Sequence, residues 1–281
     1  MIFAAFSRPS ALAKPLLLAA ALLSPLAMAN ERFVLGISES AAADANRLNA
    51  QVRYRAFADL LAQATKTPVF VQERSKLSDI EAGVRNGEFD FVLVRPADIA
   101  ARAMREHNYR YVASGKPEAR CLVGVTKDSP IQQLADVQGK RIATLDNARA
   151  YIVRFCAADL RDNGIDLSKQ KLHTVKLQGA VGVSVASGLA DVGLFTIQDG
   201  SAWEKQGNRI IHTSVPQPYF PLVASPRVSN EQIEAVRRAL QAPANAATLK
   251  ALGMDGVDIG QEQQLQTRLL PWLQGQAKPS P

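Results

Sequence analysis

A single arginine follows an apolar segment in FDFVLVRPADIA, at residues 89–100. Residues 89–94 predict a strand that is buried on both faces, and a helical pattern follows Pro96. In open α/β sheets, ligands bind at the carboxyl ends of the strands, close to helix N-termini with free N–H groups. Arg95 is therefore a candidate for bidentate pairing with an acidic ligand, the alternative being an ion pair with a carboxylate such as Asp98.

Other polar side chains also follow expected strands. The turn DNARAY at residues 146–151 offers Asn147, Arg149 and Tyr151, and Asp146 or Asn147 is expected to cap the next helix. Ordinary loop composition, a solvated arginine or buried packing would also explain several of these side chains. The candidate ligand-binding residues are Ser38, Glu39, Ser40, Tyr54, Arg95, Asn147, Arg149, Tyr151, Gln178 and Tyr219.

The sequence contains no motif for a metal site, a phosphate-binding loop or a hydrolase nucleophile. His107, His173 and His212 lie far apart and have no metal-ligand spacing, so we expect no metal and no cofactor. The glycine-rich stretch at residues 178–188 lacks the features of a phosphate loop, and no G-x-S-x-G motif is present. We therefore expect a binding protein and not an enzyme.

The charge pattern bears on the choice of partner. The formal net charge is +7, but acidic and basic residues alternate without a run of five or six like charges. Such interspersed charge argues against a nucleic-acid partner and indicates a mild bias toward anionic ligands.

Two cysteines are present, Cys121 and Cys156, both in apolar surroundings. The start of the chain, described next, predicts export. An exported chain meets an oxidising compartment, which favours a disulfide between the two cysteines. Two separate buried thiols would also fit these surroundings.

The first 29 residues have the features of a signal peptide. Arg8 and Lys14 precede a short apolar run that ends in Ala27-Met28-Ala29, an A-x-A cleavage site. The alternative is a membrane anchor, although the run is short for a bilayer. We expect a periplasmic protein whose mature chain begins at Asn30 and carries no lipid, because the new N-terminal residue is not cysteine.

The rest of the chain alternates between expected strands and helices in two sets. A Pro-rich crossing segment follows at 215–225, and a helical tail begins with Ser229 or Asn230 as its cap. This order predicts two α/β lobes, each a mainly parallel sheet flanked by helices. The expected strands lie at residues 32–38, 68–73, 89–94, 109–114, 121–125, 141–145, 171–177, 191–196 and 208–214, and the expected helices at 46–66, 77–88, after Pro96, 129–140, 149–161, 181–187 and about 261–273.

Three motifs resemble those of one protein family. They are GEFDFVLVRPADIAARA at 87–103, DSPIQQLADVQGKRIATLD at 128–146 and VASGLADVGLF at 185–195. On these motifs the chain resembles the periplasmic solute-binding proteins of ABC transporters with the type 2 fold, in their phosphate/phosphonate-type group. With the order of elements, the resemblance implies a first lobe from residues 30–116, a second lobe from 117–213, and a crossing and return to the first lobe over 214–281.

The resemblance also implies a function. We expect a monomer that captures a small, anionic ligand between two lobes by hinge closure and delivers it to the membrane permease of an ABC importer. One alternative is a sensor that presents its closed form to a membrane receptor kinase, and a third hypothesis is a secreted hydrolase. None of the motifs identifies the ligand.

Overall fold

The structure is a computed structural model that describes residues 1–2, 32–39 and 47–276, apart from the side chains of Glu39 and residues 47–51. Residues 3–29 of the expected signal peptide, and Ser40, lie outside the described residues. Within the described ranges, no helix combines the length and the apolar character needed to cross a membrane.

The first of two sheets contains six strands in the order β11-β4-β10-β3-β1-β2. Strands β2 and β3 lie parallel to β1, whereas β10 runs antiparallel to both β3 and β4, and β11 runs antiparallel to β4. The sheet is therefore mixed, with its parallel part at one side. Its strands are β1 Phe33–Glu39, β2 Val69–Glu73, β3 Phe91–Arg95, β4 Arg110–Ala119, β10 Gln217–Ala224 and β11 Gly256–Asp258.

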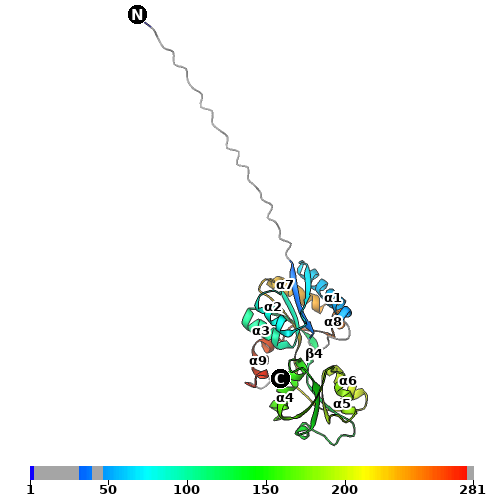
Figure 1. The fold of residues 1–281 in the computed structure, drawn as a ribbon. Coiled ribbons are helices and arrows are strands. Elements are labelled where there is room, and N and C mark those ends of the chain that lie inside the picture. The colour runs from blue at the N-terminus through cyan, green and yellow to red at the C-terminus, as the bar shows by residue number, and fades with distance from the viewer. Residues whose placement is uncertain (3–31, 40–46, 277–281) are drawn as a thin grey trace. The chain divides into compact units, whose positions relative to one another are not determined.

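Helices cover this sheet and complete the first lobe (Figure 1). A large apolar core joins them to the strands, with Phe33, Phe57, Phe91 and Trp272 almost fully buried in it. A π-helical turn at Gln264–Arg268 precedes α9, and both pack against α3. The helices are α1 Arg47–Thr65, α2 Leu77–Arg85, α3 Ala97–His107, α7 Asn230–Gln241, α8 Ala246–Ala251 and α9 Leu269–Leu273.

The second sheet contains five strands in the order β7-β6-β8-β5-β9 and forms the second lobe. Strands β7 and β8 lie parallel to β6, whereas β5 is antiparallel to β8 and β9. Two apolar clusters flank the sheet, one with α4 and the other with α5 and α6. The elements are β5 Leu122–Val125, β6 Arg141–Leu145, α4 Tyr151–Asp162, β7 Lys171–Val175, α5 Ala180–Ala186, β8 Val192–Phe195, α6 Ile197–Lys205 and β9 Arg209–Thr213.

The α/β class and the two lobes agree with the sequence, but the Pro-rich segment at 215–225 is not only a crossing. Most of it forms β10, which is buried along its whole length between β3 and β4. Pro218 and Pro221 are tolerated in this central strand because the register with β4 shifts between Gln217 and Leu222. Proline lacks the N–H that an unbroken ladder requires, so it is confined to such irregular places.

Two further elements differ from the expectation. The helix expected at 129–140 is only a 3-10 turn at Leu134–Val137, and the strand expected at 109–114 continues to Ala119 as β4. The cap of α7 is Ser229, whose hydroxyl accepts a hydrogen bond from the backbone N–H of Gln232, so that prediction is confirmed.

Two segments connect the lobes, one between β4 and β5 and the other between β9 and β10. They are hydrogen-bonded to each other. Arg120 donates to the carbonyl oxygen of Ser214 over 2.9 Å, and the N–H of Cys121 donates to the Ser214 hydroxyl over 2.8 Å. Paired connections of this kind are where a hinge between two lobes is expected.

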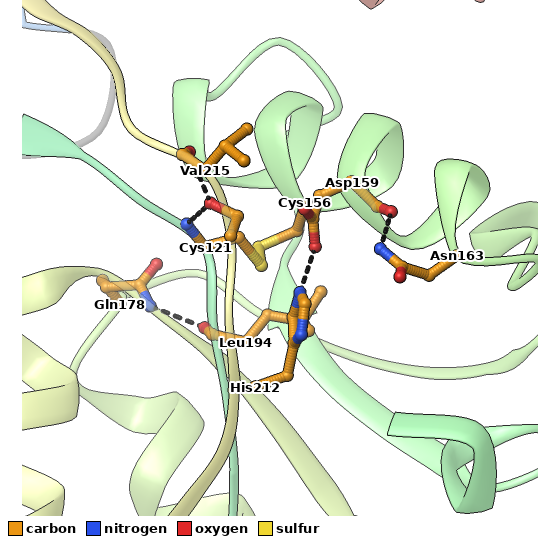
Figure 2. Close-up of a disulfide and its surroundings, with 9 residues drawn as sticks. Cys121, Cys156, Asp159, Asn163, Gln178, Leu194, His212 and Val215 are labelled. Carbon is orange, nitrogen blue, oxygen red and sulfur yellow. Dashed lines mark hydrogen bonds and ion pairs between the residues drawn. A yellow bond between two sulfur atoms is a disulfide. The ribbon is translucent and has the colours of Figure 1, made fainter. Parts of the chain in front are cut away.

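A disulfide joins Cys121, next to this hinge, to Cys156 in α4, with Cα atoms 5.0 Å apart. Figure 2 shows the bond together with the His212 ring, which points at Asp159 of α4 and lies 2.6 Å from its carboxylate. The disulfide therefore fastens α4 to the chain segment that enters the second lobe.

Replacing Cys121 and Cys156 together by alanine is expected to lower the free energy of unfolding by about 2–4 kcal/mol, because the closed loop restricts the unfolded chain. Urea unfolding of the oxidised protein and the double variant measures the difference. A reductant should destabilise the wild type and leave the double variant unchanged. Two free thiols in denatured, non-reduced exported protein would contradict the disulfide.

Candidate functional site

Arg95 ends β3 and is held among aromatic side chains of β10. Its Nη1 donates a hydrogen bond to the Tyr219 hydroxyl over 2.7 Å. Its guanidinium carbon lies 4.2 Å from the centre of the Phe220 ring and 5.5 Å from that of Tyr219. The ion pair with Asp98 is not formed, since Asp98 pairs with two other arginines, Arg102 and Arg154.

The backbone of β10 sets up this arrangement. The ladder between β10 and β4 shifts register on both sides of Tyr219. Phe220 has a φ of 47°, which is costly for a bulky residue. The irregularity lets Tyr219 and Phe220, although adjacent, both direct their rings at Arg95. Strain of this kind is typical of binding and catalytic sites.

Tyr151 of the second lobe lies beside Tyr219 and Arg95 of the first lobe. It begins α4, and its ring centre lies 6.0 Å from that of Tyr219. Burial raises the pKa of the Tyr151 hydroxyl, Tyr219 and Asp199 raise it further, and Arg95 opposes them. The hydrogen bond and the ring contact bring the side chains of Arg95, Tyr219 and Tyr151 together between the lobes.

Asp199 comes from the first turn of α6. Thr196 caps that helix, accepting from the Asp199 N–H over 3.2 Å, and its hydroxyl donates to the Asp199 carboxylate over 2.5 Å. Thr196 and Asp199 are not among the candidate residues expected from the sequence. The T-x-x-D spacing at the end of the strand expected at 191–196 is the signal that could have identified them.

Gln178 and Asn147 also lie at the carboxyl ends of strands in the second sheet. Gln178 donates its amide to the carbonyl of Leu194 over 3.0 Å, as Figure 2 shows, and its own carbonyl oxygen is buried with no partner in the described part of the chain. Asn147 accepts a hydrogen bond from the N–H of Arg149. The N-cap of α4 is Ala150, so the expected cap by Asp146 or Asn147 is wrong.

The remaining candidates have other surroundings. Arg149 pairs with Glu81 of the first lobe over 2.8 Å. Ser38 is fully buried at the end of β1, and its hydroxyl has no hydrogen-bond partner within the described ranges. Tyr54 is 1% exposed and belongs to the core of the first lobe. Glu39 ends β1, but its side chain and all of Ser40 lie outside the description.

The structure thus brings together three of the predicted residues, Arg95, Tyr151 and Tyr219. One cation and two hydroxyl groups can bind a small anion. Among the residues described, no group of three or more histidine, cysteine or acidic side chains could hold a metal ion.

Solved structures with this fold include several binding proteins. The protein XAC2383 from Xanthomonas citri, bound to chloride ion, has 19% identity and a TM-score of 0.67, covering 86% of this chain and 97% of its own. PhnD1 from Prochlorococcus marinus, in complex with methylphosphonate, has 12% identity and a TM-score of 0.64, and the match covers 88% of this chain and 100% of PhnD1.

A binding protein component of an ABC phosphonate transporter from Pseudomonas aeruginosa has 18% identity, a TM-score of 0.56 and 84% coverage of both chains. At these identities the likeness concerns the fold alone.

No curated protein matches the sequence. The model of one family does match, over residues 40–265, and its members are described as periplasmic substrate-binding proteins of ABC phosphonate transporters. Because this match covers most of the 281 residues, the chain belongs to that family.

Proposed function

We propose that this protein captures a small oxyanion of the phosphonate class between its two lobes and delivers it to the permease of an ABC importer. The observation that carries the proposal is the convergence of Arg95 and Tyr219 from the first lobe with Tyr151 from the second. A ligand at this point would contact both lobes and therefore stabilise the closed form.

The residue types support this ligand class. A guanidinium can pair with two oxygens of one oxyanion, and tyrosine hydroxyls can donate to the others. The methylphosphonate complex of the Prochlorococcus protein and the family description agree with a phosphonate. Asn147 and Gln178 would supply further hydrogen bonds from the second lobe, and Ser38, Glu39 and Ser40 remain predicted contacts. Tyr54 would support the site from the core, and Arg149 would act through its pair with Glu81.

We further propose that the protein is a monomer, is exported through a cleaved signal peptide and acts by binding alone. Family membership supports a periplasmic location and a transport function. The hydrogen-bonded connections near Arg120 and Ser214 support a hinge between the lobes.

Replacing Arg95 by alanine should weaken ligand binding by about thirtyfold or more, because truncating one partner of a buried charge pair costs roughly 2–5 kcal/mol. A thermal-shift screen of methylphosphonate, methanesulfonate and inorganic phosphate would select the anion. Calorimetric titration of that anion then measures the affinity of wild type, R95A and R95K.

Arg141 provides the control, because its ion pair with Asp191 lies within the second lobe, away from the hinge. The R141Q variant should keep wild-type affinity. If R95A binds within about twofold of wild type and only its melting temperature falls, Arg95 is part of the scaffold and not of the ligand site.

Methylphosphonate at saturation should lower the radius of gyration in small-angle scattering, because a ligand held by both lobes favours their approach. The same measurement on R95A at that ligand concentration should show little compaction. An unchanged radius for wild type at proven saturation would argue against closure.

Export of the full chain should yield a protein that begins at Asn30, because Ala27-Met28-Ala29 fits the cleavage rule. N-terminal sequencing of protein from the periplasmic fraction tests this expectation. Recovery of the chain with Met1 still attached, or with a lipid at its new terminus, would reject it.

A further inference from the structure

A second set of charged side chains connects the lobes beside the proposed ligand site. Glu81 of α2 accepts a hydrogen bond from Arg149 over 2.8 Å, and Asp98 of α3 accepts one from Arg154. Both carboxylates belong to the first lobe, and both arginines belong to the second. We call these four residues, together with Arg102, the interlobe cluster.

Arg102 organises the first-lobe side of the cluster. Its Nη2 lies 2.6 Å from a Glu81 oxygen and 2.8 Å from an Asp98 oxygen, so it holds the two carboxylates together. With two acids and one arginine, the first-lobe side carries a formal charge of −1. The second-lobe side, Arg149 and Arg154, carries +2, so the two surfaces attract each other.

Burial strengthens this attraction at one of the two contacts. The Asp98 side chain is 0% exposed and that of Arg154 is 27% exposed, whereas Arg149 is 48% exposed. Burial alone would raise the pKa of Glu81, but hydrogen bonds and charges from Arg149 and Arg102 outweigh it and lower that pKa. Arg149 and Arg102 therefore favour the charged form of Glu81.

The cluster is well placed to act on ligand binding. Arg149 lies two residues before Tyr151, and Arg154 lies three residues after it, about one helical turn along α4. Their contacts with Glu81 and Asp98 hold the start of α4 against α2 and α3. In that position Tyr151 faces Tyr219, with ring centres 6.0 Å apart.

We propose that the interlobe cluster is a latch: Glu81 and Asp98 are positioning residues that bind Arg149 and Arg154, favour the closed form before ligand arrives and seat Tyr151 in the site. The proposal rests on the hinge closure proposed above. It adds that part of the closing free energy comes from the protein itself and depends on salt, because exposed ion pairs are screened.

The test compares the ligand-free wild type with R149Q and R154Q, each of which removes one arginine from the second-lobe side. The matched control is R141Q. The Arg141–Asp191 pair has a distance of 2.7 Å and an arginine exposure of 47%, close to the 2.8 Å and 48% of Arg149 and Glu81, but it stays within one lobe. Thermal melting verifies that every variant is folded.

Small-angle scattering is recorded at about 0.01 M and about 1 M salt, where the screening length falls from about 30 Å to about 3 Å. Wild type and R141Q should both expand at high salt. R149Q should be expanded already at low salt, with an open-to-closed ratio about twofold to fivefold above that of wild type, the range expected for an exposed pair. R154Q should also be expanded at low salt, because it removes the second contact between the lobes.

Radii of gyration that are equal for wild type, R149Q, R154Q and R141Q at both salt concentrations would overturn the latch. So would a weaker affinity of R149Q for methylphosphonate without any change in the ligand-free radius, since Arg149 would then be a ligand contact. Failure of the proposed function would give a different result. The radius of gyration of wild type would still increase with salt, which supports the latch. Methylphosphonate, however, would cause no compaction at about 1 M salt, where the latch is screened.

Discussion

The insertion of β10 between β3 and β4 is the constraint on which the rest of the molecule depends. The strand is buried from Gln217 to Ala224 and runs antiparallel to both neighbours, so it forms the centre of the first sheet although it comes late in the chain. Its first residue pairs with Ala119, next to the segment that leaves for the second lobe. The same strand therefore closes the first core, defines the hinge and carries Tyr219 to Arg95.

Helix α4 is the corresponding element of the second lobe, and it is attached to its surroundings along its whole length. Cys156 ties its middle to Cys121 beside the hinge, and the Asp159 carboxylate lies 2.6 Å from His212 of β9. Near its end, Asp162 accepts a hydrogen bond over 2.6 Å from the indole of Trp272 in α9, so this end of the helix also contacts the first lobe. Because Cys156 and Asp159 fasten α4 within the second lobe, the position of its first residue, Tyr151, changes with the hinge and not by sliding of the helix.

The sequence identified those parts of the site that are encoded locally. Arg95 ends a continuous apolar strand, a pattern that requires no knowledge of the rest of the chain. Phe220 could not be found in this way. Its contact with Arg95 depends on a register shift between β10 and β4, and β4 lies far from Phe220 in the sequence. The pairing of Glu81 with Arg149 was equally hidden, since it joins residues 68 positions apart in different lobes. The two prolines of β10 suggested a loop because their tolerance also depends on that register shift.

A binding protein that closes on its ligand must balance two demands. The apparent affinity falls with the fraction of molecules in the binding-competent form, so a latch that favours the arrangement of Tyr151 and Arg95 lowers that penalty. A latch that is too strong would keep the ligand out. Exposed ion pairs contribute about 0.2–1 kcal/mol each, enough to shift the equilibrium severalfold without fixing it. The exposed Arg149 contact falls in this range, and the buried Asp98 keeps Arg102 as a partner when Arg154 moves away. Opening then leaves no carboxylate without a cation, which keeps the cost of opening low.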